Sequence, residues 1–243
     1  MTVNRGSQIR EGKAKILYQT DRPGTIIQYF KDDATAFNAL KKGQIKDKGI
    51  LNNAISCWMF KHLEKSGVKT HFLERLSDRE MLVKKLEIIP VEVVIRNRAT
   101  GSILKRLGLA KGRPFQPPLI EYFYKSDELS DPLIGETHIA YFKWATDEQL
   151  AFVRAQAFKV NDCLCRVCDE VGLELIDFKL EFGLDEKDEV LLGDEFTPDG
   201  CRLWDKKTGE PMDKDRFRQD LGGVEEAYRE VYRRLESFFG QKT

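Results

Sequence analysis

The sequence predicts one α+β domain, because strand-like and helix-like segments follow one another in blocks and do not alternate as repeated β-α-β units. β-rich segments occupy residues 7–30 and 81–96, and helical patterns occupy residues 50–66 and 147–171. Two further strands and a last helix at 224–239 complete the order. With 243 residues, the chain can form one large domain or two small lobes that share a cleft.

The N-terminal segment predicts a pair of strands. Apolar side chains alternate with Lys13 and Lys15, Arg22-Pro23-Gly24 is a turn sequence, and a run of β-branched and aromatic residues follows. Further along, the apolar run of residues 81–96 predicts two more strands, separated at Pro90.

Two segments have the period of amphipathic helices. In residues 50–66 apolar side chains recur at helical spacing. The stretch 147–171 is the clearest helix, because Thr146 and Gln149 match a capping box, one apolar stripe follows, and Gly172 can end it.

The middle of the chain has no clear period. Residues 105–145 hold four of the eight prolines and predict mostly irregular structure. A loop of that length inside a compact domain is usually functional, so we expect a binding loop or a lid there.

Composition excludes several classes of protein. Forty basic and forty acidic residues give no net charge, which disfavours a nucleic-acid-binding protein. No stretch approaches the roughly 18 uninterrupted apolar residues of a membrane span, and residues 1–15 lack the apolar core of a secretory signal. Five cysteines, an odd number, fit reduced thiols, so we expect a cytoplasmic protein with no membrane partner.

Three of the cysteines are close in the sequence and raise the question of a metal site. Cys163, Cys165 and Cys168 lie inside the helical pattern, with no histidine near them. Helix residues of the core are therefore favoured over metal ligands.

The most informative segment for chemistry is residues 175–183. As a strand it places its four large apolar side chains on one face and Asp177, Lys179 and Glu181 on the other, toward solvent or a cleft. A second strand at 189–196 can fold back on it.

A turn centred on Lys187-Asp188 would place Glu181 directly opposite Asp194. Two carboxylates in such a pair repel each other unless a cation lies between them, and oxygen ligands of this kind suit magnesium. An amphipathic hairpin with a solvated charged face is the alternative that the pattern leaves open.

Basic residues follow glycines or strands in three further places. Lys13 and Lys15, after Gly12, can bind a polyphosphate. Arg96 and Ser102 border a polar turn of the kind that binds a monophosphate. The segment 199–205 and the pair Arg216 and Arg218 are further candidates for anion binding. When each segment is taken alone, a basic strand edge or a solvated turn is the more common explanation.

Together these segments resemble the SAICAR synthetase family, the phosphoribosylaminoimidazole-succinocarboxamide synthases of purine biosynthesis. The resemblance runs in order from Arg10 to Leu235 and is far more specific than any one motif. The matching stretches are EGKAK at 11–15, LVKKLEIIPVEVVIRNRATGS at 82–102, LIDFKLEFG at 175–183, LGDEFTPDGCRLWD at 192–205 and DKDRFRQDLGG at 213–223.

The resemblance implies a two-lobed fold and a reaction. An antiparallel N-terminal lobe of about residues 1–90 would cover a nucleotide, and a larger lobe of 91–243, similar to ATP-grasp proteins and kinases, would bind substrate and metal. ATP, L-aspartate and carboxyaminoimidazole ribonucleotide would give the succinocarboxamide, ADP and phosphate through an acyl phosphate. The family also implies Mg²⁺ and a homodimer.

The resemblance assigns roles to residues of this chain, and one position departs from the pattern. Asn38 stands where relatives often carry Asp, so a contact with the amine of aspartate would be neutral here. The assigned residues are Lys13, Lys15 and Lys84 for ATP phosphates, Glu181 and Asp194 for magnesium, Asp177 and Lys179 at the reacting carboxylate, Arg96, Ser102 and Arg202 for the ribonucleotide phosphate, and Arg216 or Arg218 for substrate anions.

Two rival functions would use the same side chains. A small-molecule kinase would need no aspartate, but the HRD and DFG motifs of protein kinases are absent. A nucleotide sensor would bind ATP without turnover and has less need of the four residues Asp177, Lys179, Glu181 and Asp194. An acyl transferase with a Ser-His-Asp triad is disfavoured because no GxSxG motif occurs.

Overall fold

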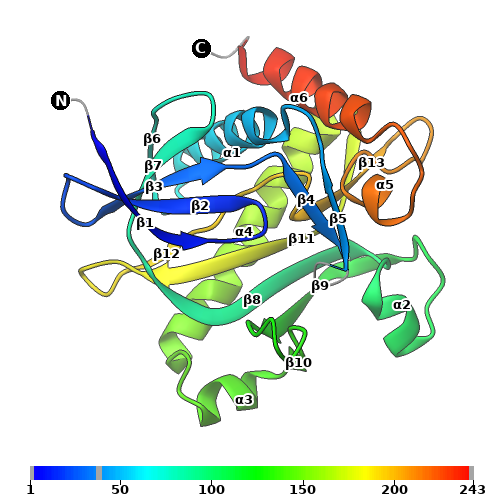
Figure 1. Cartoon of the computed structure of the whole chain (residues 1–243). Coiled ribbons are helices and arrows are strands. Elements are labelled where there is room, and N and C mark those ends of the chain that lie inside the picture. Colours follow the sequence, from blue (N-terminus) through cyan, green and yellow to red (C-terminus); the bar gives the residue numbers. More distant parts are fainter. Residues whose placement is uncertain (1–2, 37–39, 241–243) are drawn as a thin grey trace.

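Two antiparallel sheets, each accompanied by helices, form the body of the molecule (Figure 1). The computed structural model describes residues 3–36 and 40–240. The first sheet has five strands in the order β1-β2-β3-β7-β6. These strands are β1 (Arg5–Glu11), β2 (Lys15–Thr20), β3 (Thr25–Phe30), β7 (Glu80–Lys84) and β6 (Phe72–Arg75).

The second sheet lies beneath the first in Figure 1 and is built around the pairing of β8 with β11. Its strands are β10 (Leu133–Ile134), β9 (Pro114–Tyr124), β8 (Glu87–Arg98), β11 (Leu173–Leu184) and β12 (Val190–Leu192), with β13 (Cys201–Asp205) also paired to β11. A separate hairpin joins β4 (Asp33–Ala36) to β5 (Lys41–Gln44). The two-lobed α+β prediction is confirmed.

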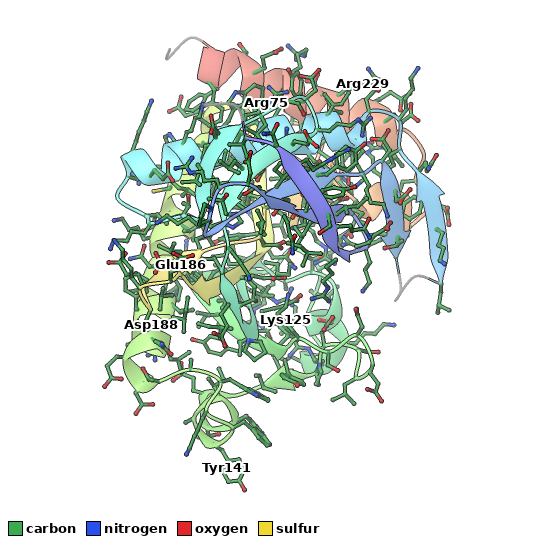
Figure 2. All side chains as sticks on the ribbon, turned by 60° about the vertical axis from the view of Figure 1, so that its left-hand side comes forward. Arg75, Lys125, Tyr141, Glu186, Asp188 and Arg229 are labelled. Atoms are coloured by element: carbon green, nitrogen blue, oxygen red, sulfur yellow. The ribbon has the colours of Figure 1, made fainter. Side chains whose placement is uncertain are left out.

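Three long helices cover these sheets. α4 (Asp147–Glu170) packs against β11 and β8, and α1 (Lys48–Lys65) packs against α6 (Val224–Gly240). The remaining helices are short: α2 (Ser102–Leu107), α3 (Glu136–Tyr141) and α5 (Asp215–Arg218). Figure 2 shows Tyr141, the last residue of α3, at the outer tip of the molecule.

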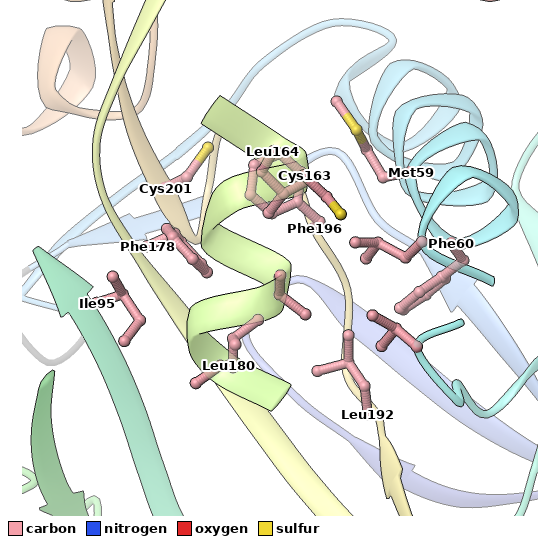
Figure 3. Close-up of a cluster of buried hydrophobic side chains, with 14 of the residues drawn as sticks. Met59, Phe60, Ile95, Cys163, Leu164, Phe178, Leu180, Leu192, Phe196 and Cys201 are labelled. Carbon is pink, nitrogen blue, oxygen red and sulfur yellow. The ribbon is translucent and has the colours of Figure 1, made fainter. Parts of the chain in front are cut away.

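α4 begins where the capping box predicts. The amide of Gln149 donates to Oγ1 of Thr146 at 3.2 Å, and the amide of Thr146 donates to Oε1 of Gln149 at 2.9 Å. Its apolar stripe is buried, and Figure 3 shows Cys163 and Leu164 of this stripe between β11 and α1. The helix prediction for 147–171 is confirmed to within one residue.

The expectation of an irregular stretch at 105–145 is wrong, because β9 is an eleven-residue strand in the second sheet. The prolines that suggested a loop lie where the strand can accept them. Pro114 begins β9, and Pro117 and Pro118 lie in the irregular part of its pairing with β8. On its other edge β9 pairs only through Tyr122 and Phe123, so the proline positions leave no bond of that ladder unmade.

Pro90 does not separate two strands, as the sequence suggested. β8 runs without a break from Glu87 to Arg98. Pairing with β11 shifts between Glu92 and Ile88, so Pro90 occupies a β-bulge where its missing donor costs no ladder bond. The carbonyl of Pro90 still accepts from the amide of Lys125 at 3.0 Å. The first sheet ends at Lys84 and the second begins at Glu87, while a lobe boundary at residue 90 stays a prediction.

Candidate active site

A cleft of about 560 Å³ lies between the first sheet and the second. The turn from β1 to β2, the strands β3 and β7, and the strands β8 and β11 all contribute to its walls. The segment after β9 closes one side, and Lys125 of this segment is labelled in Figure 2. Both polar and apolar side chains line the cleft, so it can receive a ligand with a charged and an uncharged part.

The three lysines that the resemblance assigns to ATP all line this cleft. A tight turn, in which the amide of Gly12 donates to the carbonyl of Lys15 at 2.8 Å, brings Lys13 and Lys15 to its mouth. Lys13 pairs with Asp127 at 2.6 Å across the cleft. Lys84 lies 3.6 Å from Asp185.

Glu181 and Asp194 come together around one ammonium group. Nζ of Lys179 lies 2.5 Å from Oε1 of Glu181, 3.2 Å from Oδ2 of Asp194 and 3.3 Å from Oε1 of Glu92. Lys15 pairs with Asp194 from the opposite sheet. The cleft therefore holds carboxylates and ammonium groups from both lobes at hydrogen-bond distance.

The strand register that led to the pairing of Glu181 with Asp194 is wrong by one residue. The amide of Gly193, and not of Asp194, lies opposite Glu181 and donates to its carbonyl at 2.9 Å. The turn is longer than predicted because the Asp185 carboxylate accepts from the amides of Lys187 and Glu189. β12 ends at Leu192, and Asp194, with φ 59°, turns into the cleft after the strand has ended.

The neighbouring opposite charges determine the ionisation of Asp194 and Lys179. Burial alone would raise the pKa of Asp194, but Lys15 and Lys179 hold it well below its ordinary value. Burial alone would lower the pKa of Lys179, but Asp194, Glu181 and Glu92 raise it well above its ordinary value. Both groups therefore carry their full charge at neutral pH.

Asp177 belongs to a second charged cluster on the same strand. Its Oδ2 accepts from Nη1 of Arg96 at 2.8 Å and from Nη1 of Arg202 at 2.9 Å. Asp215 accepts from Arg202 at 2.8 Å and from Arg218 at 2.6 Å. Three of the arginines predicted to bind substrate anions are thus joined through two buried carboxylates.

Ser102 and Arg216 have different positions relative to this cluster. A side chain at Gly101, which has φ 65°, would come within 2.8 Å of Nη2 of Arg202, so the residue before Ser102 packs on the cluster. Arg216 instead donates to the carbonyl of Pro211 and to Glu210, each at 2.6 Å. Of the two alternatives Arg216 and Arg218, the structure brings only Arg218 into contact with the cluster.

Several residues of the cleft escaped the sequence analysis. Glu92 is a lone charge within the apolar part of β8, and its pKa is raised by burial; that isolated charge is a signal that could have identified it. Lys125, which lies 2.5 Å from Glu181, falls in the stretch that was expected to be irregular. His71 lines the cleft from the segment before β6, and burial lowers its pKa to about 3, so the ring is neutral.

The residues present fit a magnesium–nucleotide ligand. Glu181 and Asp194 supply hard oxygen ligands, and magnesium usually binds through one or two carboxylates together with nucleotide phosphates and water. Within residues 3–36 and 40–240 no group of three or more His, Cys, Asp or Glu side chains forms a complete metal site. A magnesium ion held by Glu181 and Asp194 would take its remaining ligands from the nucleotide and from water.

The fold and the cleft define a class: a two-lobed α+β protein with an interlobe cleft lined by lysines and carboxylates. Comparison with known proteins gives the family. The family model of SAICAR synthetase matches residues 8–235. The chain belongs to the SAICAR synthetase family, as the resemblance predicted.

Individual relatives match nearly the whole chain. The phosphoribosylaminoimidazole-succinocarboxamide synthase of Novosphingobium aromaticivorans is 57% identical over 236 residues, which is 96% of this chain and 90% of that protein. The crystal structure of the synthase from Ehrlichia chaffeensis is 50% identical, covers 95% of this chain and 98% of its own, and has a TM-score of 0.93. A SAICAR synthetase in complex with ADP is 43% identical over 94% of this chain and 97% of its own, with a TM-score of 0.91.

Proposed function

We propose that this protein is an ATP-dependent ligase that joins L-aspartate to the carboxylate of carboxyaminoimidazole ribonucleotide, giving the succinocarboxamide ribonucleotide, ADP and phosphate. Family membership over residues 8–235 supports the reaction. The observation that carries it in the structure is the interlobe cleft, whose walls include the five residues assigned to ATP and magnesium together with Lys179, which was assigned to the reacting carboxylate. These are Lys13, Lys15, Lys84, Lys179, Glu181 and Asp194.

The cleft has a place for each part of ATP. Leu17, Ile26, Leu86 and Ile88 line its apolar part, which suits an adenine ring. Lys13, Lys15 and Lys84 would bind the phosphates as point charges. Glu181 and Asp194 would hold Mg²⁺, which when bound offsets the negative charge of the phosphates.

The arginine cluster would bind the ribonucleotide. Arg96, Arg202 and Arg218 are guanidinium groups, which match phosphate geometry with two parallel hydrogen bonds, and Ser102 can add a hydroxyl donor. Asp177 and Lys179 point from the same face of β11, two residues apart, or roughly 7 Å along the strand. A ribonucleotide bound by the arginines would therefore present its carboxylate near Lys179.

The chemical step is then a transfer between neighbours. A carboxylate is a poor electrophile, so its oxygen would first take the γ-phosphoryl group from ATP and release ADP. The aspartate amine would attack the acyl carbon, the C–O bond would break, and phosphate would leave with that oxygen. Lys13, Lys15 and Lys179 would offset the charge that develops on the transferred group. The raised pKa of Lys179, caused by Asp194, Glu181 and Glu92, suits this role.

Further parts of the proposal rest on the family resemblance. We expect a homodimer in the cytoplasm that acts on small molecules and binds neither nucleic acid nor membranes. No helix among the described residues is long and apolar enough to cross a membrane. Asn38, whose contact with aspartate would be neutral, lies outside the described residues.

The reaction is tested by measuring phosphate release from ATP with magnesium and the carboxylated ribonucleotide, with and without L-aspartate. We expect release that depends on aspartate and equals the succinocarboxamide formed. Turnover indifferent to aspartate would indicate a kinase or phosphatase, and ADP binding without any turnover would indicate a sensor. Substrate labelled with ¹⁸O in its carboxylate should transfer one labelled oxygen to phosphate, and unlabelled phosphate would reject the acyl phosphate.

A further inference from the structure

Asp194 has a backbone conformation that its own sequence does not favour. Its φ of 59° lies in the left-handed region, which few residues other than glycine adopt, although aspartate is among the more tolerant. Such a conformation persists where surrounding contacts impose it, and these positions are often functional. The contacts that impose it here are therefore of interest.

Two side chains of the N-terminal lobe bind the backbone of Asp194. Nε2 of Gln28, on β3, donates to the Asp194 carbonyl at 3.3 Å. The ring of His71 also hydrogen-bonds the backbone of Asp194. Both side chains are almost fully buried, with exposures of 3% and 5%, and both line the cleft.

A ladder of main-chain bonds holds His71 in place. Its amide donates to the carbonyl of Leu192 at 2.9 Å, and its carbonyl accepts from the amide of Lys84 at 2.7 Å. The amide of Leu192 in turn donates to the carbonyl of Lys69 at 3.0 Å. The segment 69–71 thus lies between β7 of one lobe and β12 of the other. β12 is the strand that ends just before Asp194.

One nitrogen of the His71 ring, Nε2, is buried and unpaired among the described residues. An unsatisfied buried polar atom costs free energy, so its retention beside a charged cleft calls for a reason other than stability. The bond between the ring and the backbone of Asp194 supplies that reason.

We propose that Gln28 and His71 are positioning residues, which fix the Asp194 backbone so that its carboxylate faces the cleft beside Glu181. The inference rests on the proposed function, in which Asp194 binds the magnesium of the nucleotide. It adds that Gln28 and His71 of the N-terminal lobe align Asp194, which belongs to the other lobe. Residues that orient metal ligands typically change metal affinity by about 10-fold to 100-fold when they are lost.

The test separates metal-assisted binding from binding in general. ADP affinity is measured by calorimetry with Mg²⁺ and again with EDTA, on the wild type, His71→Phe and Gln28→Met. We expect the gain in ADP affinity on adding Mg²⁺ to fall by about tenfold or more in both variants, while the affinity in EDTA stays within about twofold. His71→Asn, whose side-chain amide can also donate a hydrogen bond, should recover most of the gain.

His62→Phe is the matched control. His62 packs against Phe238 and Phe239 on the far side of α1, so the same substitution there should leave the Mg²⁺-dependent gain unchanged. Thermal unfolding without nucleotide checks that each variant folds. If His71→Phe does not fold, Gln28→Met and Gln28→Glu carry the same comparison on the other donor.

The outcomes are distinct. An unchanged Mg²⁺-dependent gain in the folded variants, or an equal loss with and without Mg²⁺, would overturn the positioning role. A wild-type protein that binds ADP with no gain from Mg²⁺ would overturn the nucleotide part of the proposed function, and this inference with it.

Discussion

Two charged regions on the same face of β11 are built in different ways. Around Lys179 and Glu181, lysines from three segments contact carboxylates as single point charges. In the three pairs made by Lys179 the N–O distances are 2.5–3.3 Å. Around Asp177, arginines form a network in which Arg202 joins two buried carboxylates. One strand therefore carries a lysine region at Lys179 and Glu181, in the interlobe cleft, and an arginine region around Asp177, two residues before Lys179.

The difference between ammonium and guanidinium groups indicates a different role for each region. An ammonium group on a flexible chain can follow a phosphoryl group as it moves, whereas a planar guanidinium fixes one orientation. We infer that the lysine region serves transfer and the arginine region holds the ribonucleotide still. Substitutions that separate turnover from binding can break or sharpen this comparison.

The largest effect is expected at the centre of the lysine region. Lys179→Met removes the ammonium group that contacts Glu181, Asp194 and Glu92, and we expect kcat to fall by about 10²–10³-fold, as when one donor to developing charge is removed. Steady-state kinetics give the value. Lys187→Met, on the exposed turn of the same hairpin, should change kcat by less than about twofold. A normal kcat in Lys179→Met would remove this residue from the chemistry.

The next effect concerns the phosphates of the nucleotide. Lys15→Met should weaken ADP binding by about 10-fold to 100-fold, because a hydrogen bond to a charged group contributes about 1.5–3 kcal/mol. Calorimetry of Mg²⁺–ADP binding measures this loss. Ribonucleotide affinity should be unchanged, and a loss confined to the ribonucleotide would reverse the assignment.

In the arginine region, Arg202→Lys keeps the charge but removes the fork that joins Asp177 and Asp215. We expect KM for the ribonucleotide to rise by about tenfold, with KM for ATP within about twofold. Arg216→Lys is the comparison, because Arg216 contacts Pro211 and Glu210, and its effect on either KM should be small. Equal effects of the two substitutions would contradict a special role for the cluster.

The smallest effect is expected at the edge of the cleft. Lys13 and Asp127 are both exposed, and pairs of this kind contribute about 0–1 kcal/mol to stability. Asp127→Ala should therefore leave the unfolding temperature nearly unchanged, while ADP affinity stays equal or improves by a few-fold, because Lys13 is released from a competing carboxylate. A marked loss of ADP affinity would show that Asp127 itself helps to bind the nucleotide.

Local chemistry explains which parts of the structure the sequence could predict. The faces of β11 followed from alternation alone, and α4 followed from its capping box and apolar stripe. β9 was missed because its prolines are acceptable only where a neighbouring strand is absent or irregular, which depends on pairing that is distant in sequence. Asp194 was expected in the cleft, but from a strand register that is wrong by one residue. Its side chain enters the cleft because Asp194, which follows the end of β12, has a left-handed backbone conformation.

Three of the residues that sequence reasoning missed share one property. His71, Gln28 and Lys125 enter the cleft from segments whose partners lie more than 50 residues away, such as Leu192 for His71 and Glu181 for Lys125. No local pattern marks them, because the cleft is made only when the two sheets meet. Family resemblance predicted which residues would contact the ligands, and the structure added residues of the cleft that lie among them.

The division of work between the two regions is tested most directly by titrating Mg²⁺–ADP and the ribonucleotide separately into wild type, Lys15→Met and Arg202→Lys. The account predicts that Lys15→Met loses affinity for ADP alone and Arg202→Lys loses affinity for the ribonucleotide alone. If each substitution weakened both ligands equally, or each weakened the other's ligand, the two regions would not be separate binding sites.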